Sequence, residues 1–266
     1  MSLVSTGPVL AGWWPAVVVD GTKRGFGEGM VIAGMGATAV RRLPPALPVG
    51  LLWGVLLLAS WPLLALARRL LPPLLPEVLF CAPGDGRRLA LTIDDGPSPA
   101  SDALLVLLGD LEVPATLFLI GNHMQVDGVS FRLDAASFMA QLLATERALQ
   151  QAAAPRELRL RWFRPGGGWF HRPMLRQLNA AGYRLALGSL FPLDTHHPPG
   201  WFLRRFLLLH AHPGAVIVLH DRPDTLPATL ATLRQVVPLL QRRGYRFVTL
   251  DGLVQPEAAR DPGQPA

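Results

Sequence analysis

Short apolar runs alternate with longer amphipathic stretches between residues 88 and 250, and this alternation constrains the fold more than any other feature. The short runs predict strands, and the longer stretches predict helices. The expected strands are 88–93, 115–120, 160–163, 184–189, 215–220 and 245–250, and the expected helices are 99–111, 135–152, 172–181, 200–211 and 226–243. Strands that alternate with helices through short loops form a parallel sheet with right-handed crossovers, which is either doubly wound or closed as a barrel.

The first of these strands ends in two adjacent carboxylates, Asp94 and Asp95, within the sequence LTIDDGPS. The turn signal Gly96-Pro97 follows them. Neighbouring side chains at a strand end point in different directions, so the pair can combine a metal ligand with a proton acceptor. The residues alone leave a second interpretation open, in which this is an Asp-rich turn that caps the helix beginning near Pro99.

An uncharged apolar run, Ala46–Ala67, precedes this region and is bracketed by arginine pairs. About 20 apolar residues span the hydrocarbon core of a bilayer, and Trp53 and Trp61 suit its interfaces. We therefore expect residues 44–70 to form a transmembrane or signal-anchor segment rather than a buried core helix. Ala65-Leu66-Ala67 has the pattern of a signal-peptidase cleavage site, and the sequence does not decide whether the anchor is removed.

The whole chain is organised around the apolar run and the alternating region. The expected segments are 1–43 as an irregular N-terminal segment, 44–70 as the membrane segment, 71–86 as a Pro-rich linker, 87–254 as one α/β domain and 255–266 as a disordered tail. Translation can start at Met1 or at Met30, and the sequence does not choose between them.

The composition limits the partners of the chain. Half of the residues are hydrophobic and the mean hydropathy is +0.30, in agreement with a membrane segment. The net charge of +6 comes mainly from arginines that occur in pairs rather than in long runs, which favours a dispersed solvated surface over a patch for anionic lipid or an acidic polymer. No nucleic-acid motif is present, and the single Cys81 excludes an internal disulfide.

Five segments resemble, in order, the motifs of the NodB-like polysaccharide deacetylases, carbohydrate esterase family four. They are LTIDDGPS at 91–98, ATLFLIG at 115–121, GNH at 121–123, WFRPGGG at 162–168 and VLHD at 218–221. The resemblance implies an α/β fold of a distorted (β/α) barrel, complete or lacking one α/β unit, preceded by one transmembrane helix. It also places the functional site at the carboxyl ends of the strands.

The resemblance assigns four catalytic roles. Asp94 matches the catalytic base, and Arg164 matches the arginine that holds this base by a charge-assisted hydrogen bond. His220 matches the general acid, and Asp194 matches the carboxylate that orients it. The residues alone leave two alternatives open, in which Arg164 is a surface arginine beside a turn and Asp194 is a turn residue.

The resemblance also implies a divalent metal. Asp95 and His123 match two ligands, and Asp127 stands where the family has the second histidine of an H-x3-H pair. An aspartate can complete a set of three protein ligands that leaves one position open for water. Zinc is the first expectation, with cobalt or manganese as alternatives, because the added carboxylate favours harder metals. Alternatively, His123 is a loop histidine without a ligand role.

Three further residues are expected at the substrate. Gly167 stands where the family usually has an aromatic residue whose backbone N–H binds the oxyanion. The stacking surface would then come from Trp169 or Phe170. Leu219 lies beside His220 in the last motif and is expected to contact the substrate as well.

The expected activity is metal-dependent hydrolysis of N-acetyl groups on a glycan that contains N-acetylglucosamine, either peptidoglycan or a chitin-like polymer, with release of acetate. The domain would lie outside the cytoplasm, where such polymers are found. One departure supports an alternative: the family's helix and strand before the histidine motif are missing, since Gly121 ends one motif and starts the next. A catalytically decayed glycan-binding relative, or a membrane protein of unrelated chemistry, therefore stays open. The sequence does not identify the glycan or the oligomeric state.

Overall fold

The computed structural model describes residues 16–19, 49–83, 86–120 and 134–255. Its strands are β1 (Ala16–Val19), β2 (Val78–Leu79), β3 (Arg88–Gly96), β4 (Ala115–Ile120), β5 (Trp162–Phe163), β6 (Arg184–Ala186), β7 (Ala215–His220) and β8 (Arg246–Val248). Its helices are α1 (Val49–Leu74), α2 (Ser101–Asp110), α3 (Ala135–Ala153), α4 (Arg172–Ala180), α5 (Gly200–His210), α6 (Leu226–Arg242) and α7 (Leu250–Val254), with short 3₁₀ turns η4 (Gly166–Gly168) and η5 (Asp194–His196).

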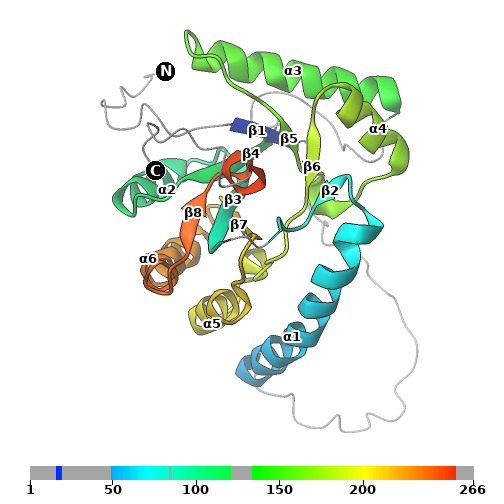
Figure 1. The fold of residues 1–266 in the computed structure, drawn as a ribbon. Helices are drawn as coiled ribbons and strands as arrows, with labels where there is room; N and C mark the ends of the chain where they lie inside the picture. Colours follow the sequence, from blue (N-terminus) through cyan, green and yellow to red (C-terminus); the bar gives the residue numbers. More distant parts are fainter. Residues whose placement is uncertain (1–15, 20–48, 84–85, 121–133, 256–266) are drawn as a thin grey trace, which may run out of the picture.

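The strands form two parallel sheets that face a common interior (Figure 1). One sheet has the order β1-β4-β3-β7, with β8 paired to the start of β3, and the other has the order β2-β6-β5. A parallel bridge between Leu190 and Ile217 joins the two sheets on one side, and β1 lies beside β5 on the other. The result is a distorted barrel with helices outside it, as the resemblance to the deacetylase family implies.

Side-chain alternation along the strands separates the inside of the barrel from its outer layer. Leu89, Leu91 and Ile93 of β3 belong to the buried cluster that includes the apolar faces of α2, α5 and α6. Ala90 lies in a different cluster, with inward residues such as Trp162 of β5. Because successive strand residues point to opposite faces, the residues two and four positions after Ala90 also point inward. These residues are the ones that carry the chemistry.

The expected strands and helices of residues 88–250 are all present, most of them within two residues of the expected bounds. The expectation of an irregular segment at 1–43 is wrong for Ala16–Val19, which forms β1 and pairs in parallel with β4. The expected linker at 71–86 is also wrong in part: α1 continues to Leu74 through Pro72 and Pro73, and β2 pairs with β6. Phe80 and Ala82, which follow β2, are buried, so residues 78–82 belong to the domain.

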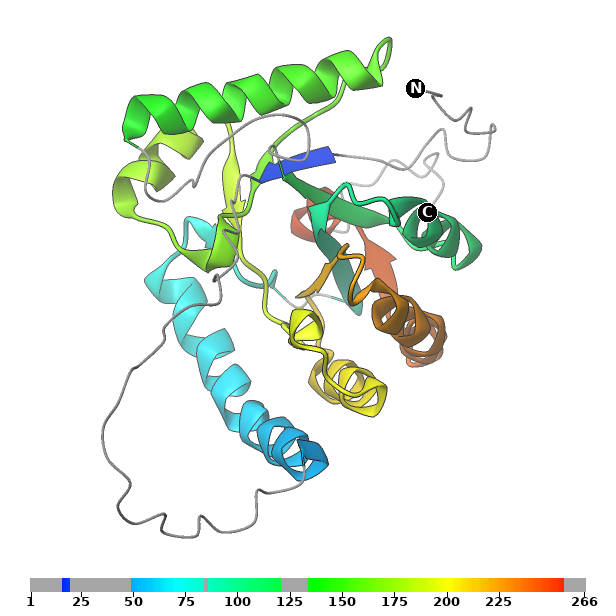
Figure 2. The same cartoon turned by 180° about the vertical axis from the view of Figure 1, so that it is seen from behind.

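Helix α1 is long and apolar enough to cross a membrane, by length and composition, and it is mostly exposed. One of its faces nevertheless packs on α5 (Figure 2). The Trp53 ring lies 4.7 Å from the Phe202 ring, and Leu57 is buried. Ser60 Oγ lies 2.8 Å from His210 Nε2. Since the Ser60 hydroxyl donates to the Leu57 carbonyl, His210 is the donor in this contact.

Candidate active site

The candidate active site lies at the carboxyl ends of the strands, on the inward face of the barrel. Thr92 and Asp94 follow Ala90 on that face of β3, and His220 ends the neighbouring strand β7. Asp94 and His220 are direct partners in the register of these two strands. The strand pairing therefore places a carboxylate and an imidazole side by side at the mouth of the barrel.

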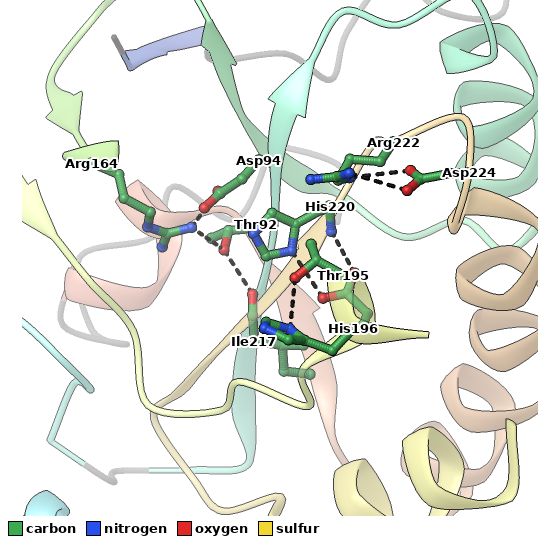
Figure 3. Close-up of polar contacts among 10 residues, drawn as sticks. Thr92, Asp94, Arg164, Thr195, His196, Ile217, His220, Arg222 and Asp224 are labelled. Atoms are coloured by element: carbon green, nitrogen blue, oxygen red, sulfur yellow. Dashed lines mark hydrogen bonds and ion pairs between the residues drawn. The ribbon is translucent and has the colours of Figure 1, made fainter. Parts of the chain in front are cut away.

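Asp94 is held by Arg164, which comes directly after β5. Arg164 Nη1 donates to Asp94 Oδ1 at 2.5 Å and to Thr92 Oγ1 at 2.8 Å (Figure 3). Its Nε donates to the Ala186 carbonyl at 2.9 Å. The guanidinium also lies 4.0 Å from the centre of the Phe118 ring. Arg164 is 4% exposed, so the interpretation as a surface arginine is excluded.

The Asp94–Arg164 pair is largely buried, with side chains 14% and 4% exposed, and this burial shifts the pKa of both groups. Burial raises the pKa of the Asp94 carboxyl above its ordinary value of 3.8, and the positive charges of Arg164 and His220 reverse this effect only in part. Burial lowers the pKa of Arg164, and the charge and hydrogen bond of Asp94 oppose this effect. Asp94 is thus a more basic carboxylate than a free aspartate while it keeps a charged partner.

His220 is held by Asp194, which is buried in η5 after β6. Asp194 Oδ1 lies 2.9 Å from His220 Nδ1, and Asp194 Oδ2 accepts from the His220 backbone N–H at 2.8 Å. A carboxylate is an acceptor, so Nδ1 carries a proton and the Nε2 side of the ring is left for a substrate. The preceding Leu193 is left-handed, with φ of 59°, and this turn directs Asp194 towards β7.

The charge of Asp194 also sets the protonation of His220. Burial would lower the pKa of His220, but the hydrogen bond and negative charge of Asp194, with further contributions from Asp94 and Asp95, raise it above the ordinary 6.5. A raised pKa keeps a larger fraction of the histidine protonated at a given pH, and a protonated histidine can act as a general acid.

The expected metal ligands are only partly within the described residues. Asp95 follows Asp94 at the mouth of the barrel and is left-handed, with φ of 66°. His123 and Asp127 lie outside the described residues, and within the described part no group of three His, Cys, Asp or Glu side chains could hold a metal ion. By chemical type, two carboxylates and an imidazole suit a divalent cation. The ligand set therefore stays a prediction.

The residues expected at the substrate differ in their placement. Gly167 has φ of 65° in η4, and Trp169 is 69% exposed with its indole against Gly167. Leu219 is fully buried in the cluster shared with the helices outside the barrel. Because it alternates with His220, it faces away from the side on which Asp94 and His220 meet, so the structure does not place Leu219 at the open site.

Thr92 is a site residue that the motif comparison did not single out. Its hydroxyl donates to the Ile217 carbonyl at 2.7 Å and accepts from Arg164, so it fixes the arginine between the two sheets. A hydroxyl two residues before Asp94, within an otherwise apolar strand, shares a face with the carboxylate. This two-residue spacing is the sequence feature from which Thr92 could have been predicted as a site residue.

A parallel barrel with an arginine-held carboxylate beside an aspartate-held histidine defines an acid–base site of the kind found at the carboxyl ends of β/α barrels. The family model described as Polysaccharide deacetylase matches residues 82–133. A chitooligosaccharide deacetylase of Azorhizobium caulinodans is 30% identical over 191 residues, which cover 60% of this chain and 91% of the relative. The chain belongs to the polysaccharide deacetylase family.

Another relative agrees with this assignment, and two solved structures share the fold. A peptidoglycan-N-acetylglucosamine deacetylase of Bacillus cereus is 26% identical over 198 residues, covering 67% of this chain and 93% of the relative. The solved Bc1960 peptidoglycan N-acetylglucosamine deacetylase has the same fold, with a TM-score of 0.60 at 23% identity, covering 69% of this chain and 95% of that chain. BA3943 of Bacillus anthracis, described as a CE4 family pseudoenzyme, has the same TM-score of 0.60 at 18% identity. The match covers 67% of this chain and 69% of that chain.

Proposed function

We propose that this protein hydrolyses the N-acetyl groups of a glycan that contains N-acetylglucosamine, with Asp94 as general base and His220 as general acid. The observation that supports it most is the joint presence of the Asp94–Arg164 and His220–Asp194 pairs at neighbouring strand ends. These two pairs supply a proton acceptor and a proton donor at one place. The named activities of the relatives supply the substrate class.

The described residues account for the proton transfers. Asp94 accepts a proton from the attacking water while Arg164 and Thr92 hold its position. The water oxygen then adds to the acetyl carbonyl carbon. His220 donates its proton to the amine nitrogen as the C–N bond breaks, and acetate and a free glucosamine leave. A backbone N–H at Gly167 is the proposed donor to the developing oxyanion.

A metal completes the proposal. Asp95, His123 and Asp127 would hold a divalent cation, zinc first and cobalt or manganese as alternatives. When bound, such a cation polarises the acetyl carbonyl and lowers the pKa of the attacking water.

We also propose that α1 attaches the protein to a membrane with the domain on the outer side, where peptidoglycan and related polymers are found. The outer face of α1 is apolar, with Leu58 and Leu63 strongly exposed, and its sequence contains no acidic residue. Such a surface suits lipid acyl chains. The relatives named for peptidoglycan are consistent with a substrate in the cell wall.

A second candidate function is glycan binding without catalysis. It is favoured by Asp127 at the position of a ligand histidine and by the short path from β4 to α3. The likeness in fold to a pseudoenzyme is compatible with either function, because at 18% identity it concerns the fold alone.

An assay of acetate release separates the catalytic proposal from glycan binding without catalysis. The full chain in detergent is incubated with N-acetylglucosamine oligomers or peptidoglycan and with added zinc, cobalt or manganese. The catalytic proposal expects release that Asp94→Asn and His220→Ala abolish. Asp102→Asn, an exposed change on α2, is the matched control and should retain the rate. Glycan binding without release of acetate under any metal would support the second candidate.

A further inference from the structure

Asp221 follows His220 and is almost completely buried, at 3% exposure. Its carboxylate accepts from the Ser98 hydroxyl at 2.6 Å, from the Ser101 hydroxyl and from the Ser98 backbone N–H at 3.3 Å. Its own backbone N–H donates to the Asp94 carbonyl at 2.8 Å. One residue thus contacts the chain on both sides of the loop from Asp94 to Ser98.

The loop that Asp221 closes has an uncommon backbone. Asp95 has φ of 66°, a conformation that residues with a side chain adopt at an energetic cost and keep only when their surroundings enforce it. Gly96 lies against Asp221: a Cβ at Gly96 would be 3.3 Å from Asp221 Oδ2 and 3.3 Å from Leu119 Cδ2. A side chain at residue 96 would therefore require Asp221 or Leu119 to move by a few tenths of an ångström.

We propose that Asp221 is a positioning residue that closes the Asp94–Ser98 loop and so fixes the directions of the Asp94 and Asp95 carboxylates. The inference rests on the proposed function and extends it to a residue that contacts no reacting atom. Ser98 and Ser101 serve as its hydroxyl donors. We call the contacts of Asp221 with this loop the clamp. Because Asp221 adjoins His220, the clamp also fixes the loop relative to the proposed acid.

A purely structural role is the rival account, because Asp221 also lies at the start of α2, where a carboxylate stabilises a helix. The two accounts differ in what else they change. A structural cap affects the free energy of unfolding alone. A positioning clamp also affects the turnover number, its pH dependence and the metal affinity, since these depend on where Asp94 and Asp95 point.

The test uses Asp221→Asn and Ser101→Ala, with Ser101→Thr as the variant that keeps the hydroxyl. Ser137→Ala is the matched control, because Ser137 donates to Asp134 at 2.7 Å at the start of α3 and thus loses the same kind of hydrogen bond. Each variant is measured for kcat and KM against pH, for zinc affinity by calorimetry, and for hydrogen exchange of the amides of residues 94–101.

For Asp221→Asn we expect kcat and zinc affinity to fall by about 10- to 100-fold, with little change in KM. The Ser98 amide should exchange faster. Ser101→Ala should show smaller effects in the same direction, Ser101→Thr should reverse them, and Ser137→Ala should show none. Unchanged kcat, zinc affinity and exchange in a less stable Asp221→Asn protein would overturn the clamp. If the wild type neither releases acetate nor binds zinc, the proposed function fails, and hydrogen exchange alone decides whether the clamp exists.

Discussion

Asp94 and His220 are register partners on the parallel strands β3 and β7. The distance between the proposed base and acid is therefore set by main-chain hydrogen bonds of the sheet rather than by loops. Each of the two side chains is then fixed by a partner from the second half of the chain, Arg164 after β5 and Asp194 after β6. Sheet pairing sets the spacing, and the ion pairs set the protonation.

The first prediction concerns the pH profile of kcat. Asp94 must be deprotonated to accept a proton, so its raised pKa places the acid limb above 3.8. His220 must be protonated to donate, so its raised pKa places the alkaline limb above 6.5. Asp194→Asn removes the charge that raises the pKa of His220, and we expect the alkaline limb to move to lower pH while the acid limb stays.

Asp224→Asn is the control for this prediction, because Asp224 is a nearby carboxylate that pairs with Arg222 instead of His220 (Figure 3). It should leave both limbs in place. An alkaline limb that is the same in Asp194→Asn and in the wild type would contradict the assignment of His220 as the acid.

The second prediction concerns stability. Arg164→Met leaves the largely buried Asp94 carboxylate without its cation, which costs about 3–5 kcal/mol when the carboxylate is charged. The pKa of Asp94 in the folded variant then rises further above its unfolded value, so the folded state binds more protons and stability falls as pH increases. Urea unfolding should therefore show a larger loss at pH 8 than at pH 5. The double variant Asp94→Asn/Arg164→Met should recover part of the loss, and a loss independent of pH would argue against a charged buried pair.

The third prediction concerns Asp127. If it is a metal ligand, Asp127→Ala should weaken zinc binding by about 10-fold or more, and Asp127→His should retain binding and favour zinc over manganese, because imidazole is the softer ligand. Competitive calorimetry with the two metals measures both effects, and circular dichroism checks that the fold is intact. Equal zinc affinity in Asp127→Ala and the wild type would remove Asp127 from the ligand set.

The fourth prediction compares two glycines with nearly the same backbone conformation. Gly214 has φ of 78° and Gly182 has φ of 83°. A Cβ at Gly182 meets nothing within 4 Å, so Gly182→Ala should cost only the left-handed strain of about 1–2 kcal/mol. A Cβ at Gly214 would collide with the Ala82 carbonyl, and the Gly214 carbonyl accepts from the Ala82 N–H. Gly214→Ala should therefore be clearly less stable than Gly182→Ala in thermal unfolding, and equal stability would contradict the packing of residues 80–82 against β7.

Much of the fold was predictable because it depends on local periodicity. The strand 215–220 and the strand 115–120 have the bounds that their apolar runs predict, and α6 ends one residue before the predicted end. The Pro-rich stretch after α1 was harder, because proline and glycine suggest a linker wherever they cluster. Only the pairing of Val78–Leu79 with β6, some hundred residues later, makes it part of the domain.

The site was predictable to the extent that its residues belong to short motifs. Asp94, Arg164, Asp194 and His220 could be named from the sequence, and the structure brings them together. The placement of Leu219 was wrong because adjacent residues of one motif were assigned to one face, although a strand turns them to opposite faces. Contacts such as Asp221 with Ser98 join positions far apart in sequence, and no local pattern reports them.

The strand β1 has a consequence for α1, which follows it in the chain. β1 pairs with β4 inside the domain, so residues on both sides of α1 belong to the same folded body. A segment that crosses a bilayer once leaves its two flanks in different compartments. A bilayer-spanning α1 and a β4-paired β1 are thus alternative states of one chain, and insertion of the helix would withdraw a strand from the barrel and leave one edge of β4 open.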